Sequence, residues 1–212
     1  MLILHRYPDT ASLIVEMVLQ ELDLPYDGRL IDREHGATST PEYRALHPLG
    51  LIPVLETDDG PIFETAAILM YLTESFPNTL APAPGSPDRA AFLKWLFFTS
   101  TNLHTVLLQT FYPARTAGPE HTEAVVEHAH AKLRIFLNIL NEVAEPSPSF
   151  MSATQPTILG YYIAVLMRWL APDFPPSDYP ALHRMLAYLE TRPAVQTCAE
   201  AENLGPKPFT ES

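Results

Sequence analysis

Residues 47–72 constrain the fold of this chain more than any other stretch, because they combine a predicted strand pair with a helix start. Two short apolar runs, Val54–Glu56 and Pro61–Phe63, are separated by a polar pair. That pair is Asp59-Gly60, which is typical of the positive φ angles in a tight hairpin turn. The stretch therefore predicts a β-hairpin that leads directly into a helix.

The hairpin is flanked by residues that suit a binding site for an anion. Pro53 precedes the first strand, where its missing N–H is tolerated and where a cis peptide is most accessible. Glu64-Thr65 follows the second strand and opens a helix whose apolar positions are Ala66, Ile68, Tyr71 and Leu72. Free N–H groups at a helix start attract anions, so a carboxylate pocket is predicted here.

The residues before the hairpin predict a small mixed sheet. Leu2–His5 is a strand candidate, an amphipathic helix begins near Ser12, and Arg29–Ile31 is a second, weaker strand. Pro41–Leu46 has the length of one or two helical turns. The order β-α-β-α-β-β-α, with a crossover helix between the first strands, indicates an α/β domain with helices packed on the sheet.

The second half of the chain is predicted to be helical. Four prolines between Phe76 and Asp88 indicate a linker. Apolar residues then repeat at helical spacing in the segments 92–106, 126–140 and 158–169, followed by shorter helices near 181–189 and 194–201. Thr154 is the expected cap of the helix at 158–169, in a weak capping box Thr154-Gln155-Pro156-Thr157.

Composition excludes several classes of protein. The net charge of −12 argues against nucleic acid and anionic membrane surfaces as partners. A single cysteine, Cys198, rules out an internal disulfide, and we expect it to be an inert helix residue. No apolar run suits a signal peptide or a membrane span, so a cytoplasmic protein is expected.

The histidines do not indicate a metal site. His128 and His130 are two residues apart on a predicted helix and therefore point to different faces. With His121 they form no pattern of metal ligands, so no metal is expected.

The motif G-x-I-P-V-L, followed by D-D-G and an acidic-hydroxyl pair at a helix start, resembles the glutathione-binding half of the glutathione S-transferases. The resemblance extends over the whole chain and is closest to the bacterial beta-type members. It implies a thioredoxin-like glutathione-binding domain at 1–76, a linker at 77–87 and an all-helical domain at 88–212 that contributes the electrophile pocket. It also implies a cytoplasmic homodimeric detoxification enzyme with glutathione as co-substrate, conjugation to small hydrophobic electrophiles, possible reduction of peroxides, and no metal.

The resemblance places the thiolate-stabilising group in the loop before the first helix. The cysteine of the beta-type transferases falls on Ala11, which has no functional group. The neighbouring Ser12 is the first candidate for the catalytic donor and Thr10 is the second. The alternative for Ser12 is an N-cap of the first helix. A glutathione-dependent disulfide reductase would need a cysteine in this loop, and none is present.

The same resemblance assigns glutathione-binding roles around the hairpin. Thr65 would bind the γ-glutamyl carboxylate and Glu64 the amino group, with an ordinary helix cap as the alternative. Ile52 would offer its backbone N–H and C=O to the cysteinyl part, aimed by a cis Pro53.

One departure from the family pattern concerns the glycine carboxylate of glutathione. The family commonly has Lys or Gln two residues before the proline, and this chain has Leu51. His35, Arg33 or His47 are the candidates to replace that group. The departures at Leu51 and Ala11 motivate an alternative function, a non-catalytic binding or assembly protein with the same fold.

The electrophile pocket is expected mainly on the helices of the second domain. Its candidates are Tyr7, His104, Phe111, Tyr112 and Arg115. His104 lies where the beta-type transferases have a histidine that faces the active site, and its alternative is a satisfied core histidine. For Trp169, on a later helical stripe, a place in the core is favoured.

Overall fold

A computed structural model describes residues Met1–Glu211, which divide into two units. The first unit comprises residues 1–79 together with 191–206, and the second comprises 80–190 with the chain from 207 onward. The predicted α/β and helical halves are both present, but residues 191–206 group with the first unit and not with the helical one. None of the helices described in this part of the chain is long and apolar enough to cross a membrane.

The first unit is built on a four-stranded mixed sheet. Its strands are β1 (Leu2–Arg6), β2 (Tyr26–Leu30), β3 (Val54–Thr57) and β4 (Gly60–Phe63), in the spatial order β2-β1-β3-β4. β1 pairs parallel with β2, and β3 pairs antiparallel with both β1 and β4. The crossover between the parallel strands is helix α1 (Ser12–Glu21), as the sequence predicts.

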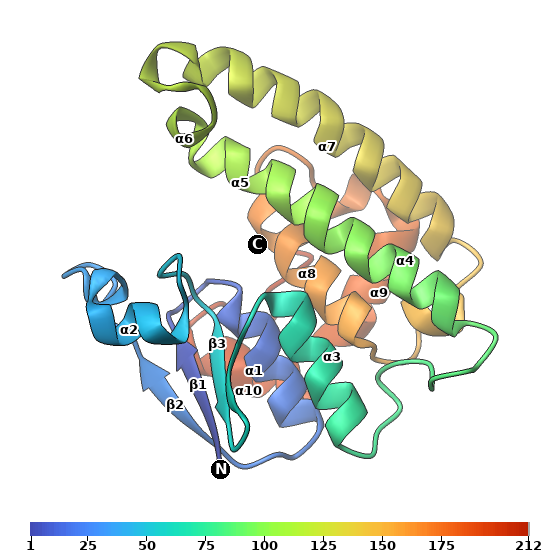
Figure 1. The fold of residues 1–212 in the computed structure, drawn as a ribbon. Coiled ribbons are helices and arrows are strands. Elements are labelled where there is room, and N and C mark those ends of the chain that lie inside the picture. Colours follow the sequence, from blue (N-terminus) through green and yellow to red (C-terminus); the bar gives the residue numbers. More distant parts are fainter. Residues whose placement is uncertain (212) are drawn as a thin grey trace. The chain divides into compact units, whose positions relative to one another are not determined.

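Helices cover both faces of this sheet (Figure 1). α1 packs against β1, and α3 (Thr65–Ser75) and α10 (Pro193–Ala201) both pack against α1. On the other face, Tyr43 of α2 (Pro41–Leu46) contacts the ring of His5 at 5.6 Å between centroids. Arg192, just before α10, forms an ion pair with Glu21 at the end of α1. This pair ties the late helix into the first unit.

The hairpin is present, but its turn is one residue earlier than predicted. Thr57 pairs with Gly60, so the two-residue loop is Asp58-Asp59 and not Asp59-Gly60. Among residues 57–60, only Gly60 has a positive φ, +114°, and it is the first residue of β4. The Thr57 hydroxyl donates to the Gly60 carbonyl at 2.8 Å and accepts the Asp59 N–H at 3.2 Å. These two bonds define the turn and explain the shift.

Strand register brings three functional segments to one end of the sheet. His5, next to last in β1, lies opposite Val54, and Val54 lies opposite Phe63, the last residue of β4. The loop after β1, Pro53 before β3 and Glu64 after β4 therefore share that end. The N-termini of α1 and α3 open there as well.

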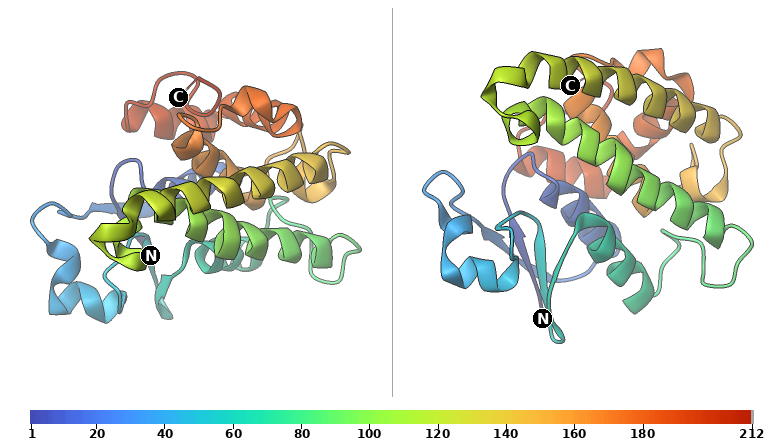
Figure 2. Two further views of the ribbon diagram at one scale, coloured as in Figure 1. Left: turned by 90° about the horizontal axis from the view of Figure 1, so that it is seen from above. Right: turned by 45° about the horizontal axis from the view of Figure 1, so that its top comes forward.

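The second unit consists of helices. They are α4 (Arg89–Phe98), α5 (Thr105–Phe111), α6 (Pro113–Ala117), α7 (Thr122–Ala144), α8 (Ile158–Leu170) and α9 (Pro180–Glu190). A π-helical segment, Thr99–His104, joins α4 to α5 in one long rod that runs alongside α7 (Figure 2). Most of α8 is fully buried, and it forms the centre of the unit. Short 3-10 turns occur in this unit at Pro119–His121, Ser149–Met151 and Pro176–Asp178, and another lies in the first unit at Ala37–Ser39.

The cap of α8 differs from the expected one. Thr157, and not Thr154, is the N-cap, because its hydroxyl accepts the Gly160 N–H at 2.9 Å. The same hydroxyl donates to the Phe150 carbonyl at 3.1 Å, and Thr157 is 3% exposed. The helix starts at Ile158, so Gly160 occupies the third helical position, where a capping box would need an acidic or amide side chain.

We expect Thr157→Ala to lower the free energy of unfolding by about 2 kcal/mol, because it removes a buried cap and a buried hydrogen bond together. Thr157→Ser keeps both bonds and should stay near the wild type. The matched control is Thr154→Ala, which changes an exposed threonine and should have an effect below about 0.5 kcal/mol. Urea unfolding followed by tryptophan fluorescence measures these changes, and a larger loss for Thr154→Ala would contradict this cap assignment.

Candidate functional site

Ser12 faces the interior of the loop that follows β1. Its hydroxyl accepts the Tyr7 N–H at 3.2 Å and donates to the Tyr7 carbonyl at 3.1 Å, and the residue is fully buried. The position before the helix belongs to Ala11, which has helical φ and ψ angles and gives no side-chain cap. Ser12 is therefore not the N-cap of α1. It instead fixes the backbone of the loop at Tyr7.

Thr10 is the more accessible of the two hydroxyl residues. It is half-buried, and its hydroxyl donates to the Tyr7 carbonyl at 2.7 Å and lies 2.9 Å from the Ser12 hydroxyl. The Thr10 and Ser12 hydroxyls have two protons between them. Three hydrogen bonds could use these protons: one from each hydroxyl to the Tyr7 carbonyl, and one between the two hydroxyls. If the Thr10 proton turns outward, Ser12 still donates to the Tyr7 carbonyl and accepts the Tyr7 N–H. Thr10 can consequently give its proton to a ligand without leaving a buried polar group unpaired.

The start of α3 has the properties of an anion site. Glu64 precedes the helix with a φ of +71° and makes no capping bond, so the first N–H groups have no side-chain partner. Thr65 is 7% exposed, yet its hydroxyl has no hydrogen-bond partner among residues 1–211. The ordinary helix-cap interpretation of this pair does not describe the structure. The free donors point instead to a ligand carboxylate.

The segment before β3 presents an unpaired stretch of backbone. The Ile52-Pro53 peptide is cis, as predicted. The Ile52 N–H and C=O form no hydrogen bond within the described chain. The Tyr43 hydroxyl donates to the Leu51 carbonyl at 2.9 Å, and burial raises the pKa of Tyr43 to about 12, so it remains a donor. The geometry allows a peptide to pair with Ile52 as an added strand.

The three candidates to replace the missing Lys or Gln near Leu51 have different surroundings. His35 pairs with Asp32 at 2.8 Å and is largely exposed. Arg33 lies over the ring of Tyr7, 6.0 Å from its centroid. His47 is buried, and its Nδ1 accepts the Leu49 N–H at 3.2 Å, so a neutral ring carries its proton on Nε2.

The surroundings of His47 also include the end of β4. Burial lowers the pKa of His47, and the charge of Glu64 opposes that shift. Its ring lies against Phe63, the last residue of β4, at 4.6 Å between centroids. His47 thus lies at the end of β4 that leads into Glu64, the residue assigned to the γ-glutamyl amino group and not to the glycine carboxylate.

Four of the five predicted electrophile residues lie together in the second unit. Phe111 contacts Tyr112, with ring centroids 6.4 Å apart, and the Arg115 guanidinium lies 4.0 Å from the Tyr112 centroid. Trp169 of α8 lies 5.9 Å from His104 and 6.4 Å from Phe111. Trp169 is only partly buried, so the core position predicted for it from the sequence differs from the one in the structure. Tyr7 belongs to the first unit, where its hydroxyl donates to Glu34 at 3.0 Å.

His104 ends the π-helical segment and has one defined partner. Its Nδ1 lies 2.8 Å from the hydroxyl of Tyr162, a buried residue of α8. Burial lowers the pKa of His104 to about 4, so the ring is neutral near pH 7. Nε2 has no hydrogen-bond partner among the described residues, and a neutral ring uses it as donor or acceptor.

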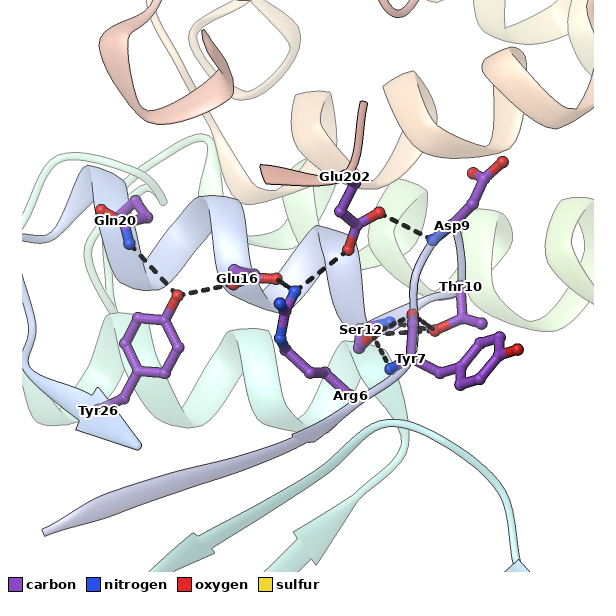
Figure 3. Close-up of polar contacts among 9 residues, drawn as sticks. All are labelled: Arg6, Tyr7, Asp9, Thr10, Ser12, Glu16, Gln20, Tyr26 and Glu202. Atoms are coloured by element: carbon purple, nitrogen blue, oxygen red, sulfur yellow. Dashed lines mark hydrogen bonds and ion pairs between the residues drawn. The ribbon is translucent and has the colours of Figure 1, made fainter. Parts of the chain in front are cut away.

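Sequence reasoning missed a largely buried polar network beside the loop after β1 (Figure 3). Arg6 of β1 pairs with Glu16 of α1 at 2.7 Å and with Glu202, just beyond α10, at 3.4 Å. The Tyr26 hydroxyl donates to Glu16 at 2.9 Å, and the Asp9 N–H donates to Glu202 at 2.8 Å. A charged residue at the end of a short helix carries no pattern that would reveal such a partner.

The remaining predictions concern Cys198 and metal ions. Cys198 of α10 is 2% exposed, and burial raises its pKa, so the thiol is protonated and shielded. This confirms the inert role expected for it. Within residues 1–211 no cluster of three His, Cys, Asp or Glu side chains has the spacing to hold a metal ion.

Comparisons with known proteins match the fold described above. Residues 11–75 match the profile "Glutathione S-transferase, N-terminal domain". A solved glutathione transferase from Methylococcus capsulatus is 30% identical, with a TM-score of 0.77 over 97% of this chain and 100% of that one. A sphingomonad glutathione S-transferase complexed with glutathione is 25% identical, with a TM-score of 0.78 over 96% of this chain and 100% of the other.

The chain belongs to the glutathione S-transferase family of enzymes. Its four-stranded sheet with flanking helices is the thioredoxin-like domain of that family, followed by the helical domain. A shorter match links part of the chain to elongation factor 1-gamma from Prunus avium, 37% identical over 111 residues. That match spans 52% of this chain and 26% of the elongation factor.

Proposed function

We propose that the protein conjugates glutathione to small hydrophobic electrophiles. The observation that carries this proposal is the uncapped start of α3, with the unpartnered Thr65 hydroxyl at the same sheet end as the free Ile52 backbone. The γ-glutamyl carboxylate binds at Thr65 and the α3 N-terminus, and its amino group faces Glu64. The cysteinyl backbone pairs with Ile52, and His35, Arg33 or His47 takes the role of the missing Lys or Gln.

In this proposal Thr10 stabilises the thiolate. A free thiol has a pKa of about 8.5, so few molecules are ionised near pH 7. The Thr10 hydroxyl donates to the sulfur, while Ser12 holds the backbone of the loop through Tyr7. The thiolate attacks an electrophilic carbon, a carbon–sulfur bond forms, and the leaving group departs with its electron pair. Ala11 contributes only its backbone.

The electrophile binds against the aromatic cluster of the second unit in this proposal. Phe111, Tyr112 and Trp169 offer flat apolar surfaces, and the neutral His104 offers one polar atom at Nε2. Uncharged, largely aromatic molecules suit such a surface, and peroxides are a second class of acceptor. The proposal also includes a homodimer. The exposed side chains of Phe97 and Ile135 are the candidate contacts between the two subunits. Sedimentation equilibrium tests this oligomeric state.

A second candidate function is a non-catalytic binding or assembly protein. The partial match to elongation factor 1-gamma favours it, together with Leu51 and Ala11 at positions where transferases carry functional groups. The two functions differ in what they require of glutathione. Turnover needs a bound, ionised thiol, whereas an assembly protein needs neither binding nor ionisation.

We expect isothermal titration near pH 7 to show saturable glutathione binding at one site per chain. Thr65→Val should weaken it about tenfold, because a hydrogen bond to a carboxylate is lost while the side-chain volume stays the same. The exposed Thr154→Val serves as the matched control and should bind like the wild type. Absence of heat at millimolar glutathione would reject the transferase proposal and favour the assembly protein.

A further inference from the structure

The loop that carries Thr10 donates a hydrogen bond to a carboxylate that is distant in sequence. The side chain of Glu202 is 1% exposed, and it accepts the Asp9 N–H at 2.8 Å (Figure 3). Its other oxygen lies 3.4 Å from Nη1 of Arg6, which also binds Glu16 at 2.7 Å. Asp9 is the residue immediately before Thr10. A single carboxylate thus links the end of α10 to the loop backbone.

The backbone conformation at Asp9 is one that such a partner helps to fix. Asp9 has a φ of +48°, which is uncommon for residues other than glycine, although aspartate adopts it more readily than most. Such conformations persist when surrounding contacts determine them, and the charged acceptor for its N–H is one of those contacts. From the other side, Ser12 fixes the N–H and carbonyl of Tyr7. The direction of the chain into Thr10 is therefore set at two points, Tyr7 and Asp9.

We propose that Glu202 is a positioning residue for catalysis, which fixes the Asp9 backbone and thereby aims the Thr10 hydroxyl at the glutathione sulfur. This inference rests on the proposed function, but the contacts of Glu202 with Asp9 and Arg6 can be tested without glutathione. Sequence separation makes the assignment unexpected, since Glu202 lies 193 residues after Asp9 and outside the expected glutathione-binding domain.

The charges around Glu202 determine which variants separate its two contacts. Burial raises its pKa, the Asp9 N–H and Arg6 lower it, and Glu16 and Asp9 raise it. Cys198 of α10 also lies close to this carboxylate, and it is uncharged because burial raises its own pKa. Glu202→Gln keeps an oxygen for the Asp9 N–H and removes the charge. Glu202→Ala removes both, so the pair distinguishes the acceptor from the ion pair with Arg6.

The first test needs no glutathione. Amide hydrogen exchange at Asp9, whose N–H donates to Glu202, should accelerate about tenfold or more in Glu202→Ala and remain near wild type in Glu202→Gln. Glu200→Ala removes an exposed carboxylate from α10 and should leave exchange unchanged. Unchanged exchange at Asp9 in Glu202→Ala would overturn the role of Glu202 in fixing the loop, whether or not the protein binds glutathione.

The second test measures catalysis through Thr10. Glu202→Ala should lower kcat about tenfold at saturating glutathione and move the midpoint of the pH profile of kcat/KM upward, while KM changes little. Glu202→Gln should retain most of the wild-type kcat and a midpoint close to that of the wild type. In the Thr10→Val background, Glu202→Ala should add almost nothing, because it acts through the same hydroxyl. Fully additive losses, or an unmoved midpoint, would overturn the positioning role while the transferase proposal stands on wild-type turnover.

Discussion

Replacing Thr10 by valine should lower kcat/KM for glutathione near pH 7 by about 10- to 100-fold. The reason is that a hydrogen bond to a charged acceptor contributes about 1.5–3 kcal/mol, and valine removes it without changing the shape of the side chain. Thr10→Ser keeps the hydroxyl and should retain most activity. Stopped-flow or steady-state conjugation assays with a chromogenic aromatic electrophile measure the change in kcat/KM.

The activity lost in Thr10→Val should depend on pH in a defined direction. The donor stabilises the thiolate, so its loss raises the pKa of the bound thiol towards the free value of about 8.5. The deficit of Thr10→Val should therefore be largest near neutral pH and shrink above about pH 9, where the thiol ionises without help. A deficit of constant size across this range would indicate a role in binding and not in thiolate stabilisation.

Ser12→Ala is the informative comparison for Thr10→Val. Ser12 is fully buried and makes two bonds to Tyr7, so its loss should lower the free energy of unfolding by about 1–3 kcal/mol. Ser12→Ala should lower kcat less than Thr10→Val does. The reverse order, wild-type turnover in Thr10→Val and a hundredfold loss in Ser12→Ala, would place the donor on Ser12, the first choice from sequence.

The sequence predicts the fold well because its strongest signals are local. Helical periodicity and proline positions locate α1, α2, α9 and α10 to within a few residues, and the hairpin is in the predicted place. Two details differ because side-chain hydrogen bonds decide them. Thr57 sets the turn at Asp58-Asp59, and Thr157 starts α8 three residues after the expected cap. Neither hydroxyl can be assigned a partner from spacing alone.

The candidate site is predictable where the chain is continuous and not where distant segments meet. The cis Pro53 and the Glu64-Thr65 pair stand within one motif, and the structure brings them to the same sheet end as Thr10. By contrast, Tyr162 lies 58 residues from His104, and Glu202 lies 193 residues from Asp9. Contacts of this kind arise from packing, which a single sequence does not record.

Burial of His104 should make the free energy of unfolding of the second unit depend on pH. The pKa of His104 in the folded protein is lowered to about 4 by burial, whereas an unfolded histidine has a pKa of 6.5. Below pH 6.5 the unfolded chain binds a proton that the folded chain does not. Stability from the neutral ring is therefore complete above about pH 6.5 and is lost progressively as the pH falls towards about 4.

We expect His104 alone to remove about 3 kcal/mol from the free energy of unfolding over that range, at about 1.36 kcal/mol per pKa unit. His104→Asn keeps an amide near Nδ1 for the Tyr162 hydroxyl but does not titrate. Its free energy of unfolding should therefore fall about 3 kcal/mol less than that of the wild type between about pH 7 and pH 4. His128→Asn, which changes an exposed histidine, should follow the wild type.

Urea unfolding at a series of pH values, followed by tryptophan fluorescence, measures this difference. Both tryptophans, Trp95 and Trp169, lie in the second unit, so the signal reports the unit that contains His104. Parallel curves for His104→Asn and the wild type would contradict the lowered pKa of His104. They would mean that the ring keeps a pKa near 6.5 in the folded protein, so the electrophile surface would gain a cation as the pH falls below that value.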